Sequence, residues 1–291
     1  MTALRPLRAA ALPIPVLALA LALAPSLAAQ QAPLPAAAPT PAPAPAPAYA
    51  PVADLVTASP LVIDATIRSE SRIKGAEAAG VAAGQARFYV EADVAQLIRG
   101  TAAIPTRIGW LVDVPLDSRG RAPKLKKRRV LVFARPVSGR AGQVQLVTPG
   151  AQLDWSPATE ALVRRIATEA NAADAPPVVT GVRSAFHVPG SLPGEGETQI
   201  FLTTEGGRPA ALSVLRRPGE QPRWSVALSE IIDDGATAPV RDTLLWYRLA
   251  CALPATLPEP ATAAIEPADA DQARADYAFV IAQLGPCRPG A

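Results

Sequence analysis

The sequence has few of the side chains that carry most enzyme and metal chemistry. Among its 291 residues there are one histidine and two cysteines, and aromatic residues make up only 4%. A zinc site needs three or four Cys, His or carboxylate ligands, which one histidine and a cysteine pair cannot supply. Neither a G-x-S-x-G nucleophile motif nor a phosphate-binding glycine loop occurs. These absences disfavour catalysis and predict no cofactor and no metal.

The remaining candidates for catalysis are the histidine and the acidic residues. His187 stands at the end of a predicted strand, where a lone histidine is typical of a structural role. The densest acidic group consists of Glu230, Asp233 and Asp234. Paired carboxylates would suit a hydrolase, and this alternative predicts a pocket beside Trp224 or Trp246. A solvated loop is the competing interpretation, since no EF-hand spacing surrounds the group.

The first 28 residues have the order of a secretory signal peptide. Two arginines precede an apolar run over residues 9–24, and residues 26–28 supply the small side chains of a cleavage site. An uncleaved membrane anchor is the alternative, but three prolines interrupt the segment. We therefore predict an exported protein, periplasmic or extracellular, with no transmembrane segment after cleavage at Ala28.

Residues 29–53 form a predicted disordered segment rich in alanine and proline. Alternating prolines lack backbone donors and favour polyproline II over helix. We therefore expect the folded part of the chain to begin at residue 54.

Charge is divided unequally between two predicted domains. Residues 54–171 carry 17 Lys or Arg against 11 Asp or Glu, whereas residues 172–291 carry 9 against 14. Without the two arginines of the signal peptide, the formal charge of +3 falls to +1. Opposite balances favour docking of the two halves or binding of different partners. Two ordinary solvated surfaces are the alternative.

Apolar alternation predicts a mainly β domain over residues 54–171. The predicted strands are residues 61–68, 88–94, 108–114, 130–133 and 143–147. Ser156 as N-cap and Pro157 at the first position predict a helix that ends at Asn171 in the left-handed conformation. Five strands and one C-terminal helix fit a small OB-like β-barrel.

This strand and turn layout resembles the extracellular OB-like modules of the netrin and metalloprotease-inhibitor type. The resemblance covers the pattern alone. Because the N-terminal cysteine and the disulfide frame of those inhibitors are missing, it assigns no residue and no activity to this chain.

Residues 172–291 predict an α+β domain, with an antiparallel sheet followed by a pair of helices. The predicted strands are residues 182–188, 199–204, 211–216 and 224–229. Asp242 and Asp269 are expected to cap the two helices, and Gly285 to end the second. In an oxidising compartment Cys251 and Cys287 predict a disulfide that joins the helix ends. A reactive thiol is the alternative.

The most concentrated charge lies in residues 119–129, the basic segment. Its cations are Arg119, Arg121, Lys124, Lys126, Lys127, Arg128 and Arg129. Such a run attracts phosphates, anionic lipid or an acidic protein face. Export and the lack of interleaved aromatic residues disfavour nucleic acid. A solubilising turn between strands is the alternative.

Together these observations predict a non-catalytic binding or interaction module of the cell envelope. Its basic segment would contact an acidic protein face or an anionic envelope component. A carboxylate-dependent hydrolase is the alternative function, and an inhibitor similar to the OB-like protease-inhibitor modules is the third.

Overall fold

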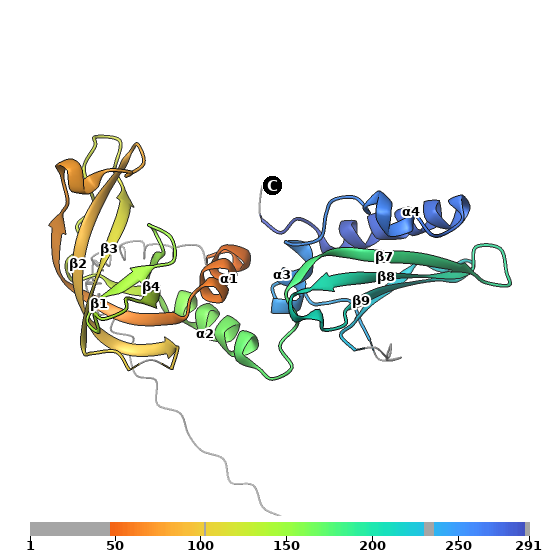
Figure 1. Ribbon diagram of the computed structural model, residues 1–291, viewed down its shortest axis with the longest axis horizontal. Coiled ribbons are helices and arrows are strands. Elements are labelled where there is room, and N and C mark those ends of the chain that lie inside the picture. The colour runs from red at the N-terminus through yellow and green to blue at the C-terminus, as the bar shows by residue number, and fades with distance from the viewer. Residues whose placement is uncertain (1–46, 102, 230–235, 289–291) are drawn as a thin grey trace, which may run out of the picture. The chain divides into compact units, whose positions relative to one another are not determined.

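Long strands with alternating apolar residues build the first sheet. The computed structural model describes residues 47–101, 103–229 and 236–288. The strands of the first sheet are β1 (Leu61–Arg72), β2 (Gln85–Arg99), β3 (Arg107–Pro115), β4 (Arg129–Pro136), β5 (Val144–Leu146) and β6 (Gln152–Asp154). They pair antiparallel in the order β3-β2-β1-β4-β5, and β6 also pairs with β4 (Figure 1). A short 3-10 helix, η1 (Gly75–Ala78), lies between β1 and β2.

The first sheet does not close into a barrel within the described residues. Between β3 and β5 there is one isolated parallel bridge, from Gly109 to Gln143. Close by, the backbone N–H of Asp113 donates to the carbonyl of Pro149 over 2.8 Å. The antiparallel sheet is confirmed, whereas the closed OB-like barrel is not found. The reason is that β5, with three residues paired to β4, is too short to pair along the nine residues of β3.

Helix α2 (Pro157–Asn171) begins at the predicted N-cap. The hydroxyl of Ser156 accepts the backbone N–H of Thr159 over 3.0 Å, and Pro157 takes the first helical position. The end of the helix differs from the prediction. Ala172 leaves the helix in an extended conformation, so the chain needs no left-handed residue at Asn171.

Helix α1 (Tyr49–Ala58) extends into the segment that was expected to be disordered. Pro51 is its third residue, within the first turn, where a backbone N–H has no intrahelical partner, so the proline is tolerated there. Tyr49, Val52 and Val56 are buried and give the helix an apolar face. The rest of the Ala/Pro-rich segment, residues 29–46, and the predicted signal peptide lie outside the described residues.

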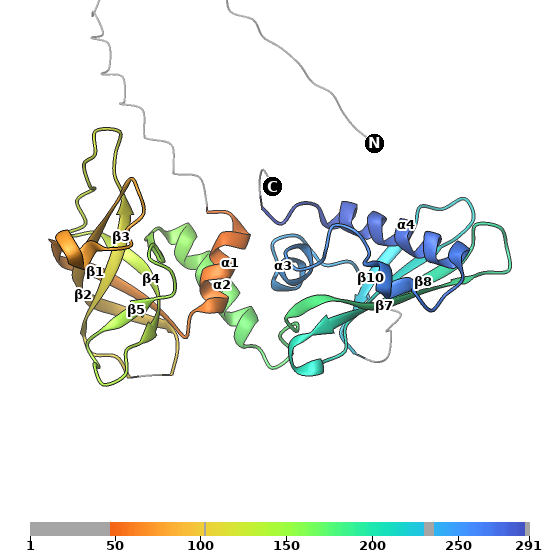
Figure 2. The ribbon, with the colours of Figure 1, turned by 45° about the horizontal axis from the view of Figure 1, so that its top comes forward.

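The second sheet is a four-stranded antiparallel meander. Its strands are β7 (Val179–Pro189), β8 (Gly196–Thr204), β9 (Ala211–Arg216) and β10 (Arg223–Ala227). They follow the order β10-β9-β8-β7, and η2 (Glu205–Gly207) forms the turn between β8 and β9. Helix α4 (Pro267–Leu284) lies along β7 and β8, and its Tyr277 and Val280 are fully buried (Figure 2). The predicted α+β arrangement of sheet and helices is confirmed.

A disulfide joins the ends of the two C-terminal helices, as predicted. Cys251 directly follows α3 (Leu244–Ala250), and Cys287 lies three residues after the end of α4. Their Cα atoms are 5.0 Å apart. The chain between the helices includes η3 (Glu259–Thr262).

The caps of these helices differ from the prediction by one to three residues. The hydroxyl of Thr243 accepts the N–H of Trp246 over 3.3 Å and so caps α3, whereas Asp242, with a φ of 60°, precedes the cap. Helix α4 begins after Glu266, which leaves Asp269 inside the first turn, where a carboxylate favours the helix dipole. Gly285 ends α4 with a φ of 67°, as predicted. Within the described ranges, no helix is both long and apolar enough to cross a membrane.

Two tyrosines, the buried Tyr49 and the half-buried Tyr247, link helix α1 to helices α2 and α3. The hydroxyl of Tyr247 on α3 donates to Asp54 on α1 over 2.6 Å, and that of Tyr49 donates to Glu169 on α2 over 3.2 Å. Burial, together with the neighbouring carboxylate, raises the pKa of both hydroxyls, that of Tyr247 to about 12. The described residues of both sheets and their helices accordingly fall in one compact unit.

Candidate functional site

The basic segment is the loop between β3 and β4, and its backbone is fixed along the end of β1. The N–H of Lys126 donates to the Glu70 carboxylate over 2.7 Å, and the N–H of Lys127 donates to the carbonyl of Ile67 over 2.8 Å. The side chain of Leu125 is buried beneath the segment. The cations therefore project from an anchored edge of the first sheet.

The structure separates the seven predicted contact residues into two groups. Three are ion-paired within the chain: Arg121 with Asp117, Arg128 with Asp154, and Arg129 with Asp64. The other four are exposed and form no ion pair with any described residue: Arg119, Lys124, Lys126 and Lys127. These four cations therefore stay without a compensating charge from the described residues.

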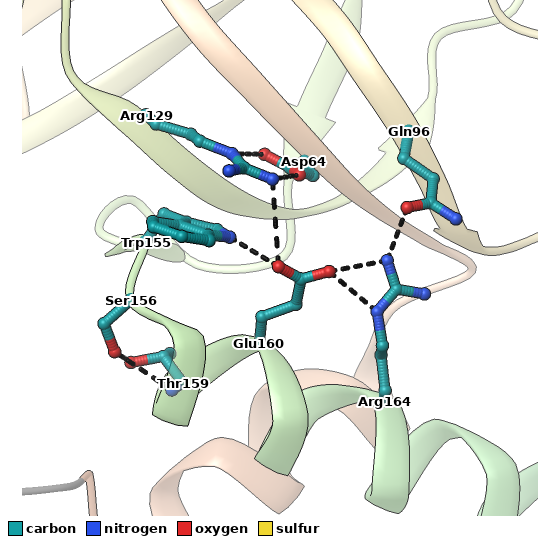
Figure 3. A network of polar contacts seen from close by, with 8 residues as sticks. All are labelled: Asp64, Gln96, Arg129, Trp155, Ser156, Thr159, Glu160 and Arg164. Carbon is teal, nitrogen blue, oxygen red and sulfur yellow. Dashed lines mark hydrogen bonds and ion pairs between the residues drawn. The ribbon is translucent and has the colours of Figure 1, made fainter.

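Arg129 belongs to a network that joins the first sheet to helix α2 (Figure 3). Its Nε donates to the carboxylate of Asp64 over 2.9 Å, and its guanidinium stacks 3.8 Å above the ring of Trp155. The indole N–H of Trp155 donates to Glu160 over 2.6 Å, and Glu160 also accepts Arg164 over 2.8 Å. Because the guanidinium of Arg129 both donates to Asp64 and stacks on Trp155, we assign Arg129 a structural role and not a role in partner contact.

The same contacts set the charges of the network. Hydrogen bonds from Trp155 and Arg164 hold the pKa of Glu160 below its ordinary value. The hydrogen bond to Asp64 raises the pKa of Arg129. Both groups therefore stay ionised at neutral pH, and the network stays intact.

His187 is bound into the second sheet. Its Nδ1 lies 2.9 Å from the hydroxyl of Thr198, which donates to the fully buried Asp276 of α4. Asp276 also accepts Arg216 Nε over 2.6 Å. A Cβ on Gly196 would come within 2.5 Å of the His187 ring, so the glycine makes room for the imidazole. These contacts agree with a structural role for His187.

The acidic hydrolase candidates Glu230, Asp233 and Asp234 lie outside the described residues. Of the two tryptophans proposed beside them, Trp246 is buried and donates its indole N–H to the carbonyl of Leu284 over 2.9 Å. The hydrolase alternative thus stays a prediction. Among the residues that the structure describes, no three His, Cys, Asp or Glu side chains are grouped as metal ligands.

A groove of about 700 Å³ lies at the seam between β3 and β5, and we call it the seam groove. It is lined by β2, β3 and residues between 135 and 149. A Cβ on Gly109 would lie 2.2 Å from the hydroxyl of Tyr89, so the glycine allows Tyr89 to lie across β3. Leu111, on the same outer face of β3, is 49% exposed. The seam groove therefore presents an aromatic ring and an exposed leucine.

The charged side chains of the seam groove differ in how they are compensated. Arg87 forms an ion pair with the buried Asp113 over 2.7 Å. Arg135 donates to the amide of Gln145 over 3.3 Å, and Arg140 to the amide of Gln143 over 3.2 Å. Within the described ranges neither Arg135 nor Arg140 has a carboxylate partner, so the groove carries two positive charges in excess.

Sequence reasoning missed the seam groove. The alternation over residues 108–114 identified the buried face of β3, but its outer face carries the informative residues. Gly109 and Leu111 both occupy outward positions there, an unusual choice for a solvated strand. Arg135 lies near the end of β4 and Arg140 within the β4–β5 turn, and only the folded sheet brings both to the groove beside β3.

No protein-family model matches the chain, and a search of curated proteins found no match.

Proposed function

We propose that the protein is an exported, non-catalytic binding module whose seam groove takes an extended acidic segment of a partner protein. The observation that carries the proposal is the combination of an apolar floor with two arginines that have no carboxylate partner among the described residues. Tyr89 and Leu111 would supply apolar contact area, and Arg135 and Arg140 would make charge-assisted hydrogen bonds to carboxylates. Export itself rests on the pattern of residues 1–28.

The side-chain amides of the seam groove support an extended polypeptide as the ligand. Gln143 and Gln145 each offer an acceptor and a donor to a peptide backbone. Both amides already bond an arginine of the groove, so a partner carboxylate would compete for that arginine and release the amide toward the backbone.

The basic segment supports the same preference for an acidic partner. Exposed cations of one sign raise the rate at which an oppositely charged molecule associates, and this effect weakens with salt. We propose that Lys124 and Lys126 steer the partner and that Arg135 and Arg140 hold it.

We further propose that the first sheet is a partly open OB-like barrel whose opening is the seam groove. The Gly109–Gln143 bridge and the hydrogen bond from Asp113 to Pro149 are contacts that would begin the closure of such a barrel. A partly open five-stranded barrel of this class binds ligands on its strand surface. The proposal therefore assigns the ligand to a place where the architecture leaves strands incompletely paired.

Fluorescence anisotropy tests the proposed function, with residues 29–291 and a labelled twelve-residue peptide of alternating Glu and Val. The double change Arg135→Gln and Arg140→Gln should weaken binding about tenfold or more, because it removes two charge-assisted hydrogen bonds. Lys124→Gln with Lys126→Gln should slow association and flatten its salt dependence. Arg217→Gln, an exposed arginine of the second sheet outside the groove, is the matched control.

Two results would contradict the proposal. One is equal binding of a Lys and Val peptide of the same length. The other is a dissociation constant that the groove variants and the Arg217→Gln control change to the same extent.

A further inference from the structure

A second cavity, separate from the seam groove, has an arginine in its wall. It measures about 510 Å³ and is lined by α1, α3, the start of β7 and residues near the disulfide. Arg248 of α3 contributes to this wall, together with Tyr247, Asp54 and Arg288. None of these residues takes part in the function proposed above.

The guanidinium of Arg248 has a buried N–H donor that lacks a hydrogen-bond partner in the described chain. Its Nε is buried and has no hydrogen-bond acceptor, and the side chain makes no hydrogen bond or ion pair with any described residue. A guanidinium has five N–H donors and no acceptor. Because buried polar groups in native proteins almost always have a partner, this donor needs an acceptor that the described chain does not supply.

One of the two carboxylates that line the cavity, that of Asp54, already has partners. Asp54 accepts the hydroxyl of Tyr247 over 2.6 Å and forms an ion pair with Arg288. Glu205 also lines the cavity, but it is exposed and forms no ion pair with a described residue. The positive charge of Arg248 is thus opposed only at a distance.

Two further arginines add to this charge. Arg99, at the end of β2, donates to the carbonyl of Val56, and Arg208, after η2, donates to the carbonyl of Ala175. Neither forms an ion pair within the described part of the chain. Burial lowers the pKa of Arg248, and the charges of Arg208 and Arg99 lower it further against the opposing effect of Glu205. Three arginines without an ion pair to any described residue outnumber the one lining carboxylate that is likewise unpaired there, Glu205, and this excess of positive charge favours binding of an anion.

We propose that this cavity binds a small oxyanion, a carboxylate or a phosphate group, through the guanidinium of Arg248. The planar fork of a guanidinium matches two oxygen atoms of either group, and a partly desolvated site strengthens the hydrogen bonds. Arg99 and Arg208 supply long-range attraction, whereas Glu205 opposes the ligand and limits affinity.

Thermal unfolding of residues 29–291 tests this site, with sodium phosphate, acetate and chloride titrated at constant ionic strength. Phosphate or acetate, but not chloride, should raise the Tm with saturation, because a ligand that binds the folded state stabilises it. Arg248→Gln should raise the half-saturating concentration at least about tenfold. Arg217→Gln removes one exposed arginine elsewhere and should change nothing. The anion that gives the larger shift identifies the chemical source of the oxyanion.

Glu205→Gln gives a second test that does not depend on the folding of the Arg248 variant. It removes the opposing charge and should lower the half-saturating concentration. The proposal is overturned if chloride acts like the oxyanions, or if neither oxyanion shifts the Tm. It is also overturned if Arg248→Gln and Glu205→Gln both respond like the Arg217→Gln control, which would leave water as the partner of Arg248.

Discussion

Each of the two sheets has an arginine that binds a fully buried aspartate, and the two ion pairs differ in which elements they join. In the first sheet, Asp64 of β1 has a side-chain exposure of 1% and is bound by Arg129, which remains 40% exposed. In the second, Asp276 of α4 has an exposure of 0% and is bound by Arg216, which is 29% exposed. An Asp–Arg ion pair thus joins two adjacent strands in the first case and a helix to a sheet in the second.

The surroundings of the two aspartates explain this difference. Asp64 and Arg129 lie on paired strands, and water reaches the outer side of the guanidinium. Asp276 projects from α4 onto the sheet, where Arg216 and the buried Thr198 both depend on it. A buried carboxylate at the helix–sheet interface therefore fixes more of the structure than one inside a sheet.

The largest expected effect comes from Asp276→Ala. This change leaves Arg216 and Thr198 without their shared acceptor, and breaking a buried ion pair from one side costs about 3–5 kcal/mol. Asp271→Ala is the matched control on the same helix, because the Asp271 side chain is 80% exposed and pairs with the partly exposed Arg274. Its effect should stay below about 1 kcal/mol. Urea unfolding of residues 29–291 measures both variants. Equal unfolding midpoints would show that the buried Asp276 contributes no more stability than the exposed Asp271.

A smaller effect is expected from Arg129→Met in the first sheet. The change leaves the Asp64 carboxylate buried without its partner, but water can approach where the guanidinium was exposed. We expect a loss of about 2–3 kcal/mol, less than for Asp276→Ala. Arg128→Met serves as the control, because its partner Asp154 is 62% exposed. The comparison between the sheets fails if Arg129→Met destabilises the protein more than Asp276→Ala does in the same urea series.

The sequence predicted the features that depend on local patterns. Apolar runs and alternation identified nine of the ten strands in the described residues, and only the short β6 was missed. Ser156 with Pro157 identified the start of α2, because the cap is a contact between neighbouring residues. The predicted N-caps of α3 and α4 were wrong, by one and three residues. Asp242 and Thr243 are both competent caps, and only the backbone conformation at Asp242 decides between them.

The charge pattern of the sequence predicted less of the candidate site than the strand pattern predicted of the fold, because an ion pair depends on long-range contacts. Seven cations in the basic segment looked equivalent, yet Asp64 precedes its partner Arg129 by 65 residues and draws it into the scaffold. The seam groove was invisible for the same reason, since it brings residues 87–113 opposite residues 135–149. Arg248 lies in an ordinary helical sequence, and only its burial shows that it lacks an acceptor.

The smallest expected effect concerns Glu160, through which the network around Asp64 extends to α2. The experiment tests whether this extension contributes to the stability of the protein. Trp155 and Arg164 lower the folded-state pKa of Glu160 from its ordinary value near 4.5. A carboxylate with a lowered pKa adds stability above its unfolded pKa, and this contribution is lost as the pH falls through the lower, folded pKa. We therefore expect Glu160→Gln to cost less than about 1 kcal/mol at pH 6 and to cost progressively less below about pH 4.5. Urea unfolding between pH 3 and pH 7 measures this difference, with Glu77→Gln as the control, because Glu77 is exposed and its carboxylate forms no hydrogen bond or ion pair with a described residue. A difference between wild type and Glu160→Gln that is constant over this range would show that the network holds α2 by packing of Trp155 rather than by the charge of Glu160.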